Sequence, residues 1–432
     1  MRTTTEPVSR SVLLVTAAVT ALGLAACSGS GEPETIPQAT PEQLTAAGLE
    51  DLPLASPDKR VDLEMPSFSN PTEVTNPLFP ISSLRSAILS GHVEGEQFKT
   101  ETTLLPQTRI IEWPEGRPVE TLISQYVAYL DGRIEEVALD YYAQADDGSV
   151  WYFGEDVFNY QDGVIADTEG TWLAGREGPA AMIMPAEPKV GEVYRPENAA
   201  GLVFEEVTIG AVGRTVQGPR GPVSGAIIAD ELHQDGQREA KTFAPGYGEF
   251  FTGSGGDVEA LSLAVPVDAR QDPVPRKLEE LTAAAAAASA RRVDSAWSAL
   301  RDANAPPRLR ARLEAAVGRL SDETTAAAAL DVLDAGLDLM LQYRRPAAID
   351  RARFALWARR LVVDAAARDG AGVRGDLATL EWIRDRFAHT LDPVARTRVD
   401  SSLVELRSLV NDEDLRGAAD VATQLREAAT SP

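Results

Sequence analysis

Hydrophobic positions follow a strand-like pattern from about residue 82 to residue 265. Short runs of β-branched and aromatic residues alternate with turn signals, and Asp-Gly pairs begin at residues 131, 147, 162 and 235. On one predicted strand, Leu122, Ser124 and Tyr126 fall on the same face. The predicted strands cover residues 85–93, 97–105, 108–113, 119–130, 133–143, 150–154, 170–173, 202–212, 223–232, 239–243, 248–252 and 258–265. Sequential hairpins without helices between them predict an antiparallel sheet curled into a half-barrel, barrel or sandwich.

The spacing changes to three and four residues after Arg276, which is typical of amphipathic helices. Pro266, Pro273 and Pro275 mark a linker over residues 266–275. Six or seven helices are expected, with Ser321 as an N-cap. Their predicted ranges are 276–303, 308–320, 321–343, 346–369, 375–391, 393–410 and 412–429. The predicted fold class is therefore α+β and multidomain: an antiparallel β-rich domain at residues 65–265, followed by an all-α helical bundle at residues 276–432.

The N-terminal segment has the features of a lipoprotein signal. Arg2 and Arg10 precede an apolar run over residues 11–26, which is too short to span a membrane comfortably. The run ends in Leu24-Ala25-Ala26-Cys27, which resembles a bacterial lipobox. We expect residues 1–26 to be a signal peptide and Cys27 to carry a diacylglyceryl anchor that holds the protein on the outer face of the cytoplasmic membrane. An ordinary secretory signal with a chance cysteine is the alternative. Residues 27–64 are rich in proline and predict a flexible tether.

Composition and charge exclude several classes of function. The 432 residues carry a formal net charge of −25, which argues against nucleic-acid binding. The acidic excess lies in the tether and the predicted β domain, because the charges of residues 276–432 balance. One cysteine excludes a disulfide framework, and three histidines exclude most histidine-rich metal centres. We therefore predict no cofactor and no metal centre.

Two groups of residues in the predicted β domain could form a site. The first, a ligand or ion surface, contains acidic and aromatic side chains: Asp140, Tyr142, Asp146, Asp147, Trp151 and Glu155. Acidic turns and ordinary core packing are the alternative. The second is a general acid–base cluster of Asp230, Glu231, His233 and Lys241, in which alternation places Glu231 and His233 on one face. No nucleophile motif such as G-x-S-x-G accompanies it, so we assign no catalytic residue.

The first group lies in the run DYYAQADDGSVWYFGE (residues 140–155), and a second element, EAKTFAPGYG, covers residues 239–248. Both elements resemble those of an uncharacterised family of secreted actinobacterial lipoproteins. Phe243 stands where that family often has tyrosine. The resemblance covers roughly residues 65–255 and implies no firm activity.

The predicted bundle contains charged residues within its apolar faces. They are Asp331, Asp334, Asp338, Asp350, Arg353, Arg360 and Asp364. Because buried charge must be paired, we expect ion pairs among them or with a neighbouring helix. A hard-cation or cationic-ligand site is the functional alternative. Trp382, Asp385 and His389 share another helix face and predict either a partner-binding patch or packing against a bundle helix.

These observations predict a membrane-anchored extracytoplasmic lipoprotein that binds a ligand and catalyses no reaction. A small apolar or cationic ligand and an envelope protein are the candidate partners, beside the membrane itself. The alternatives are a carboxylate-based hydrolase in the β domain, which needs two facing carboxylates, and a hard-cation module in the bundle.

Overall fold

The computed structural model describes residues 34–300 and 305–430. Cys27 and the expected signal segment, residues 1–26, lie outside the described residues. From Thr35 onward the chain forms one compact unit. In this unit the sheet and the helices share a hydrophobic core.

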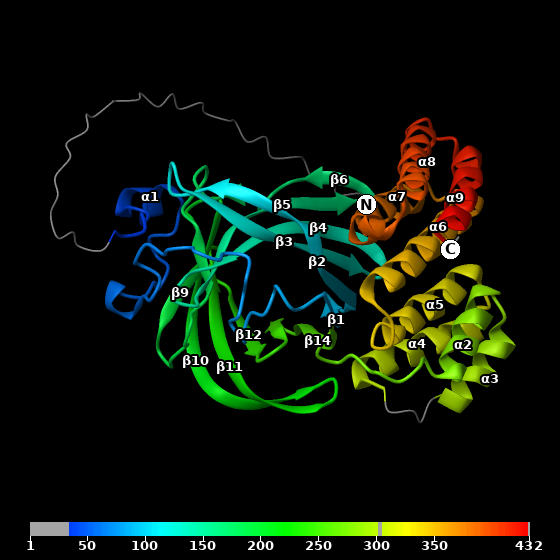
Figure 1. Ribbon diagram of the computed structural model, residues 1–432, viewed down its shortest axis with the longest axis horizontal. Coiled ribbons are helices and arrows are strands. Elements are labelled where there is room, and N and C mark those ends of the chain that lie inside the picture. The colour runs from blue at the N-terminus through cyan, green and yellow to red at the C-terminus, as the bar shows by residue number, and fades with distance from the viewer. Residues whose placement is uncertain (1–33, 301–304, 431–432) are drawn as a thin grey trace, which may run out of the picture. The chain divides into compact units, whose positions relative to one another are not determined.

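Fourteen antiparallel strands form one curled sheet, which confirms the predicted fold class (Figure 1). Their order is β6-β5-β4-β3-β2-β1-β14-β13-β12-β11-β10-β9, and β7 and β8 both pair with β5. The strands are β1 (Ser86–Val93), β2 (Glu96–Glu112), β3 (Pro118–Leu130), β4 (Arg133–Gln144), β5 (Val150–Gln161), β6 (Val164–Asp167), β7 (Trp172–Leu173), β8 (Ala181–Met184), β9 (Val193–Ala199), β10 (Val203–Gly218), β11 (Gly221–His233), β12 (Arg238–Ala244), β13 (Gly248–Ser254) and β14 (Asp257–Val265).

Asp-Gly turns account for much of this hairpin order. At 131–132 and at 162–163 both residues of the pair have positive φ, as a two-residue hairpin turn requires. The two strands predicted at 97–105 and 108–113 are one strand, β2, with an irregularity between Leu104 and Thr108. The curl brings β8, which pairs with β5, against β9 near the far edge of the sheet.

Residues 35–64 pack against the sheet, which corrects the prediction that they belong to a flexible tether. Ile36 is buried in the core, and the amide of Val61 donates to the carbonyl oxygen of Val193 on β9 at 3.0 Å. This segment contains the short helix α1 (Pro41–Ala46) and the 3-10 turn η1 (Pro57–Lys59). Buried apolar and backbone contacts therefore hold a proline-rich segment in place without long helices.

The C-terminal part is helical, as predicted. Its helices are α2 (Arg276–Ala286), α3 (Ala290–Leu300), α4 (Pro307–Glu323), α5 (Ala326–Met340), α6 (Pro346–Ala367), α7 (Gly370–Phe387), α8 (Pro393–Asn411) and α9 (Leu415–Thr430), with the short 3-10 turn η2 (Ala388–Thr390). The single helix predicted at 276–303 is wrong, because the chain breaks at Ala288, whose φ is positive. Ser321 lies inside α4, and the hydroxyl of Thr325 caps α5 instead.

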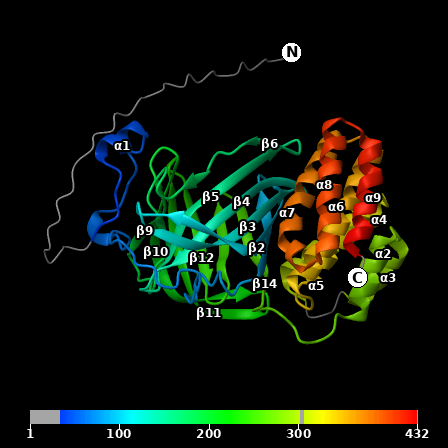
Figure 2. The same cartoon turned by 45° about the horizontal axis from the view of Figure 1, so that its top comes forward.

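The sheet separates two environments. Helices α2–α9 gather on one side of it, with α7 in contact with β2 and β4 (Figure 2). On that side Tyr129 of β3 stacks on Trp357 of α6, with ring centroids 5.6 Å apart. Side chains alternate between the two faces along each strand. Thr100 on β2 and Tyr126 on β3 therefore lie on the face away from the helices, where they line a cavity.

Candidate functional site

The face of the sheet opposite the helices lines a cavity of about 320 Å³. This volume is at the low end of the range for small-molecule sites. Eight carboxylic acids from seven strands line it, together with one lysine, Lys241 of β12. The acids are Glu136, Asp140, Glu155, Glu197, Glu205, Glu231, Glu249 and Glu259. The lining is therefore strongly acidic.

Two carboxyl groups from distant strands meet in this cavity. Glu155 on β5 and Glu197 on β9 lie close enough to shift each other's pKa. Burial raises the pKa of both groups, and the nearby Glu155 raises that of Glu197 further, so Glu197 keeps its proton at neutral pH. Beside them, the Tyr152 hydroxyl donates to Oδ1 of Asp140 at 3.0 Å. The curl of the sheet thus creates a carboxyl cluster from residues far apart in sequence.

Burial without enough positive charge raises the pKa of these carboxyl groups. Burial raises the pKa of Glu155 to about 8, and the neighbouring Asp140 adds to the shift. Burial also raises the pKa of Asp140 to about 7. The pKa of Glu259 is raised to about 7 by burial and by Glu249. At neutral pH the cavity therefore holds protons that a bound cation could replace.

Aromatic rings complete the lining. Tyr142 and Tyr152 stack with centroids 4.8 Å apart, and Phe79 meets Tyr142 edge to face at 4.9 Å. The hydroxyl of Tyr194 is buried and has no hydrogen-bond partner among the described residues. Carboxylates and aromatic faces together suit an organic cation, because both attract positive charge.

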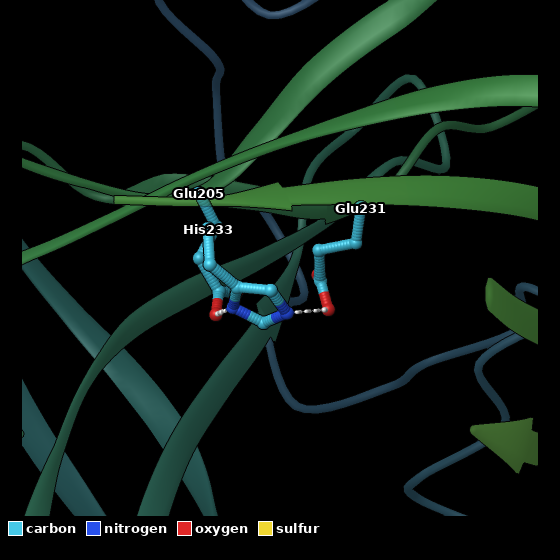
Figure 3. A group of neighbouring side chains, drawn as sticks. All are labelled: Glu205, Glu231 and His233. Atoms are coloured by element: carbon cyan, nitrogen blue, oxygen red, sulfur yellow. Dashed lines mark ion pairs between the residues drawn. The ribbon is translucent and has the colours of Figure 1, made fainter. Parts of the chain in front are cut away.

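A second acidic group lies at the rim, where Glu205 of β10 faces Glu231 and His233 of β11 (Figure 3). Oε1 of Glu205 lies 2.8 Å from Nδ1 of His233, and this hydrogen bond, together with the nearby Glu239 carboxylate, raises the histidine pKa to about 10. The predicted sharing of one face by Glu231 and His233 is confirmed. Asp230 lies on the other face, paired with Arg238.

The structure divides the ligand surface predicted from the run at 140–155. Asp140, Tyr142 and Glu155 line the cavity. The other three do not reach it. Asp146 accepts hydrogen bonds from the backbone and hydroxyl of Ser69, Asp147 accepts them from Ser149, and the buried Trp151 indole donates to the Ser149 hydroxyl. Alternation across β5 and the turn before it accounts for the division.

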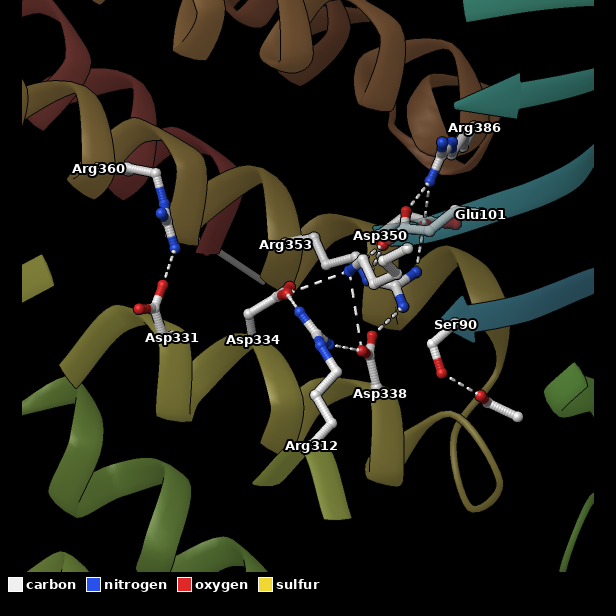
Figure 4. Close-up of polar contacts among 12 residues, drawn as sticks. Ser90, Glu101, Arg312, Asp331, Asp334, Asp338, Asp350, Arg353, Arg360 and Arg386 are labelled. Carbon is white, nitrogen blue, oxygen red and sulfur yellow. Dashed lines mark hydrogen bonds and ion pairs between the residues drawn. The ribbon is translucent and has the colours of Figure 1, made fainter. Parts of the chain in front are cut away.

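The charges predicted for the bundle form a buried network with the sheet, which corrects their expected confinement to the helices (Figure 4). Nζ of Lys99 on β2 lies 3.0 Å from Oδ2 of Asp334, and Nη2 of Arg353 lies 2.6 Å from Oδ1 of Asp338. Nη1 of Arg386 on α7 lies 2.5 Å from Oε2 of Glu101. The core network contains four cations, Lys99, Arg312, Arg353 and Arg386, and four anions, Glu101, Asp334, Asp338 and Asp350.

This balance bears on the hard-cation alternative. Carboxylate oxygens of Glu101, Asp334 and Asp338 lie within 4.8 Å of one another, as in a metal site. However, Arg353 contacts two of these acids and Arg312 contacts two of them. Their charge is already compensated, so the geometry favours docking of the bundle on the sheet.

The remaining bundle residues also make pairs. Asp331 pairs with Arg360 at 2.7 Å within the bundle, whereas Asp364 pairs with Arg133 of β4 at 2.5 Å. The indole of Trp382 donates to the hydroxyl of Tyr160 on β5 at 2.8 Å. Trp382 therefore packs on the sheet, which neither of its two predicted roles included.

Several site residues were not predicted. Glu136, Glu197, Glu205, Glu249 and Glu259 enter the cavity from five strands, and the sequence carries no signal that joins them. A local signal did exist for the network, because Lys99 and Glu101 alternate with Thr100 and Thr102 on β2. Two charged side chains two residues apart on one strand face are either exposed to solvent or buried as an ion pair. Here the helices cover that face, so Lys99 and Glu101 are buried and paired.

None of the helices in the described parts of the chain is both long and apolar enough to cross a membrane. Neither the models of known protein families nor the curated proteins include a match to this chain.

Proposed function

We propose that this protein is a membrane-anchored extracytoplasmic lipoprotein that binds a small organic cation in the cavity of its curled sheet and catalyses no reaction. The ligand carries one or more ammonium groups and an apolar body that contacts the tyrosine rings. The lipobox ending at Cys27 supports the anchor, since acyl chains at about 0.8 kcal/mol per buried CH₂ hold a protein to a membrane.

One observation carries the proposal: the acidic residues on the two faces of the sheet differ in how many cations compensate them. On the helix side, four carboxylates of the network meet four cations. On the cavity side, eight carboxylic acids line a space with one lysine, Lys241. Ionising these carboxyl groups in a confined space without compensating cations is costly. A cation that enters the cavity and pairs with them therefore stabilises the folded protein.

The other candidate ligands fit this lining less well. An apolar molecule would have to desolvate the carboxyl groups without pairing them. The hydrolase alternative needs two carboxyl groups about 5–10 Å apart, with a substrate between them. Glu155 and Glu197 instead act on each other as close neighbours that shift each other's pKa, so this pair does not hold a substrate between its two carboxyl groups.

Calorimetric titration of the purified protein with spermidine, a linear polyamine cation, tests the proposal. We expect saturable binding at about pH 8 that weakens at least about tenfold at about pH 5, where carboxyl groups with raised pKa values are protonated. Glu155→Gln removes a cavity charge at constant shape and should weaken binding about tenfold. The matched control is Glu96→Gln, an exposed residue at the start of β2.

Two results would refute the proposal. One is the absence of binding heat at either pH. The other is equal affinity in wild type, Glu155→Gln and Glu96→Gln, because binding would then reflect the overall negative charge of the protein rather than the cavity. A neutral diol of similar length serves as the ligand control and should not bind.

A further inference from the structure

The strand register brings four ionisable side chains to one face at the rim of the cavity. Glu205 of β10 is directly opposite His233 of β11, and Glu231 of β11 is directly opposite Glu239 of β12. Glu231 and His233 are two residues apart on the same strand, so their side chains point the same way. Lys241, two residues after Glu239, extends the group on β12. Three neighbouring strands therefore hold an imidazole among three carboxyl groups.

The imidazole is oriented as in a metal site. Oε1 of Glu205 lies 2.8 Å from Nδ1 of His233, which is a hydrogen bond. Metal-binding histidines almost always donate one ring N–H to a carboxylate, a backbone carbonyl or water, which leaves the other nitrogen for the metal. The other nitrogen, Nε2, points into the group formed by Glu231 and Glu239 (Figure 3 shows Glu205, Glu231 and His233).

The distances around Nε2 match ligands that share an ion. Nε2 lies 3.8 Å from Oε2 of Glu231 and 3.6 Å from Oε2 of Glu239. Both separations are too long for a good hydrogen bond. Two ligands of a tetrahedral zinc ion, each at about 2.0–2.1 Å from the metal, are about 3.4 Å apart. Nε2 thus has two carboxylate oxygens near it, and ligand atoms of Glu205, Glu231 and His233 all lie within 4.8 Å of one another.

Two buried polar atoms nearby lack a hydrogen-bond partner of good geometry among the described residues, and one of them, the Tyr194 hydroxyl, lies outside the acidic cluster. Oε2 of Glu231, whose side chain is 3% exposed, accepts no hydrogen bond of good geometry, although Nζ of Lys241 lies 2.9 Å away. The hydroxyl of Tyr194 is also buried without a partner. Tyr194 of β9 and Glu231 are both opposite Val207 of β10, in the same cross-strand row. A metal ion with its bound water could satisfy both atoms.

We propose that His233, Glu231 and Glu239 bind a divalent transition-metal ion such as Zn²⁺, with Glu205 as the carboxylate that orients the histidine. Imidazole nitrogen and carboxylate oxygen are both zinc ligands, and a fourth position remains for water. This site is proposed apart from the organic-cation site, although Glu205, Glu231 and Lys241 line the cavity as well.

The charges support an ion of charge two. With His233 protonated, two cations, His233 and Lys241, face three anions, Glu205, Glu231 and Glu239, so the group carries one excess negative charge. The metal ion replaces the proton on Nε2, and that proton leaves to solvent. The sum then becomes zero. Glu197, which also lies near Glu205 and Glu231, keeps its proton because burial raises its pKa.

Calorimetric titration of the purified protein with ZnCl₂ tests this inference. We expect one zinc ion per chain, and His233→Gln should weaken binding by about a hundredfold or abolish it. Glu205→Gln leaves all three ligands in place and should weaken binding about 10–100-fold. The matched control is His92→Gln, since His92 is an exposed histidine on β1 and its variant should bind zinc as wild type does. Circular dichroism of each variant checks that it folds.

Proton release separates a metal site from mere histidine packing. Because a histidine must be neutral at the nitrogen that binds a metal, zinc binding should release a proton, and affinity should rise with pH between about pH 6 and about pH 8. No zinc binding by the wild type overturns the inference, as does unchanged binding by the folded His233→Gln variant. His233→Gln should keep spermidine affinity within about threefold, and Glu155→Gln should keep zinc affinity within the same range, so the two proposals fail separately.

Discussion

Replacing Glu101 by glutamine tests how the bundle is held to the sheet. The Glu101 side chain is 2% exposed, and its carboxylate lies 2.7 Å from Nζ of Lys99, 2.5 Å from Nη1 of Arg386 and 3.4 Å from Nε of Arg353. The cations around it hold its pKa well below the usual range despite burial, so it is ionised at neutral pH. Glutamine keeps the shape and removes the charge.

The expected cost follows from the balance of the network. Four cations would face three anions, which leaves one buried positive charge without compensation. Breaking a buried pair in this way costs about 3–5 kcal/mol, a large part of the stability of about 5–15 kcal/mol typical of a folded domain. The matched control is Glu280→Gln, which breaks an exposed pair with Arg276 and should cost much less than Glu101→Gln.

Urea unfolding followed by circular dichroism measures these differences. The double variant Glu101→Gln, Arg386→Gln restores the balance of three against three, so it should cost at least about 1.5 kcal/mol less than the sum of its single changes. A cost below about 1 kcal/mol for Glu101→Gln would refute the reasoning, as would additivity within about 0.5 kcal/mol. Either result would mean that apolar packing alone docks the helices.

Two further predictions concern the sheet. Because burial raises the folded pKa of Asp140 to about 7 and of Glu155 to about 8, the folded state keeps protons that the unfolded chain has lost above about pH 4.3. The free energy of unfolding should therefore fall from about pH 5 to about pH 8 in urea titrations, and a rise would contradict this sign. Gly163→Ala should cost about 2 kcal/mol more than Gly116→Ala in the same assay. Both glycines have positive φ, but only at Gly163 would a Cβ meet backbone of α7, at 2.3 Å, so equal costs would contradict the contact.

Local patterns were enough to predict the fold class and most strands. Asp-Gly pairs and alternation marked the long hairpins, because turn chemistry and side-chain period act over a few residues. The edge strand β9 was missed, since Pro196 and a short polar run hide it. An edge position tolerates proline because one side of the strand needs no ladder hydrogen bond.

The site was predictable only in part. Asp140, Tyr142 and Glu155 belong to one conspicuous run of acidic and aromatic residues, but their membership of a cavity depends on the curl of the sheet. The partner of Glu155, Glu197, is 42 positions further along the chain on the far edge strand. Long-range closure of this kind is set by strand order, which the sequence pattern does not encode.

The same holds for the bundle. Its buried aspartates and arginines were correctly expected to form ion pairs, since buried charges require partners. Their partners Lys99 and Arg133 lie on strands, and no helical periodicity refers to them. The structure also locates part of the overall charge of −25, because eight of the acidic residues line the cavity.

In this account, carboxyl groups of the cavity stay protonated because too few cations compensate their charge. Calorimetric titration with spermidine at about pH 7, in two buffers that differ in ionisation enthalpy, counts the protons released on binding. Since the pKa of Glu155 is raised to about 8 and that of Asp140 to about 7, we expect about one proton released per ligand bound. Absence of binding, or binding with no proton release, would contradict the account.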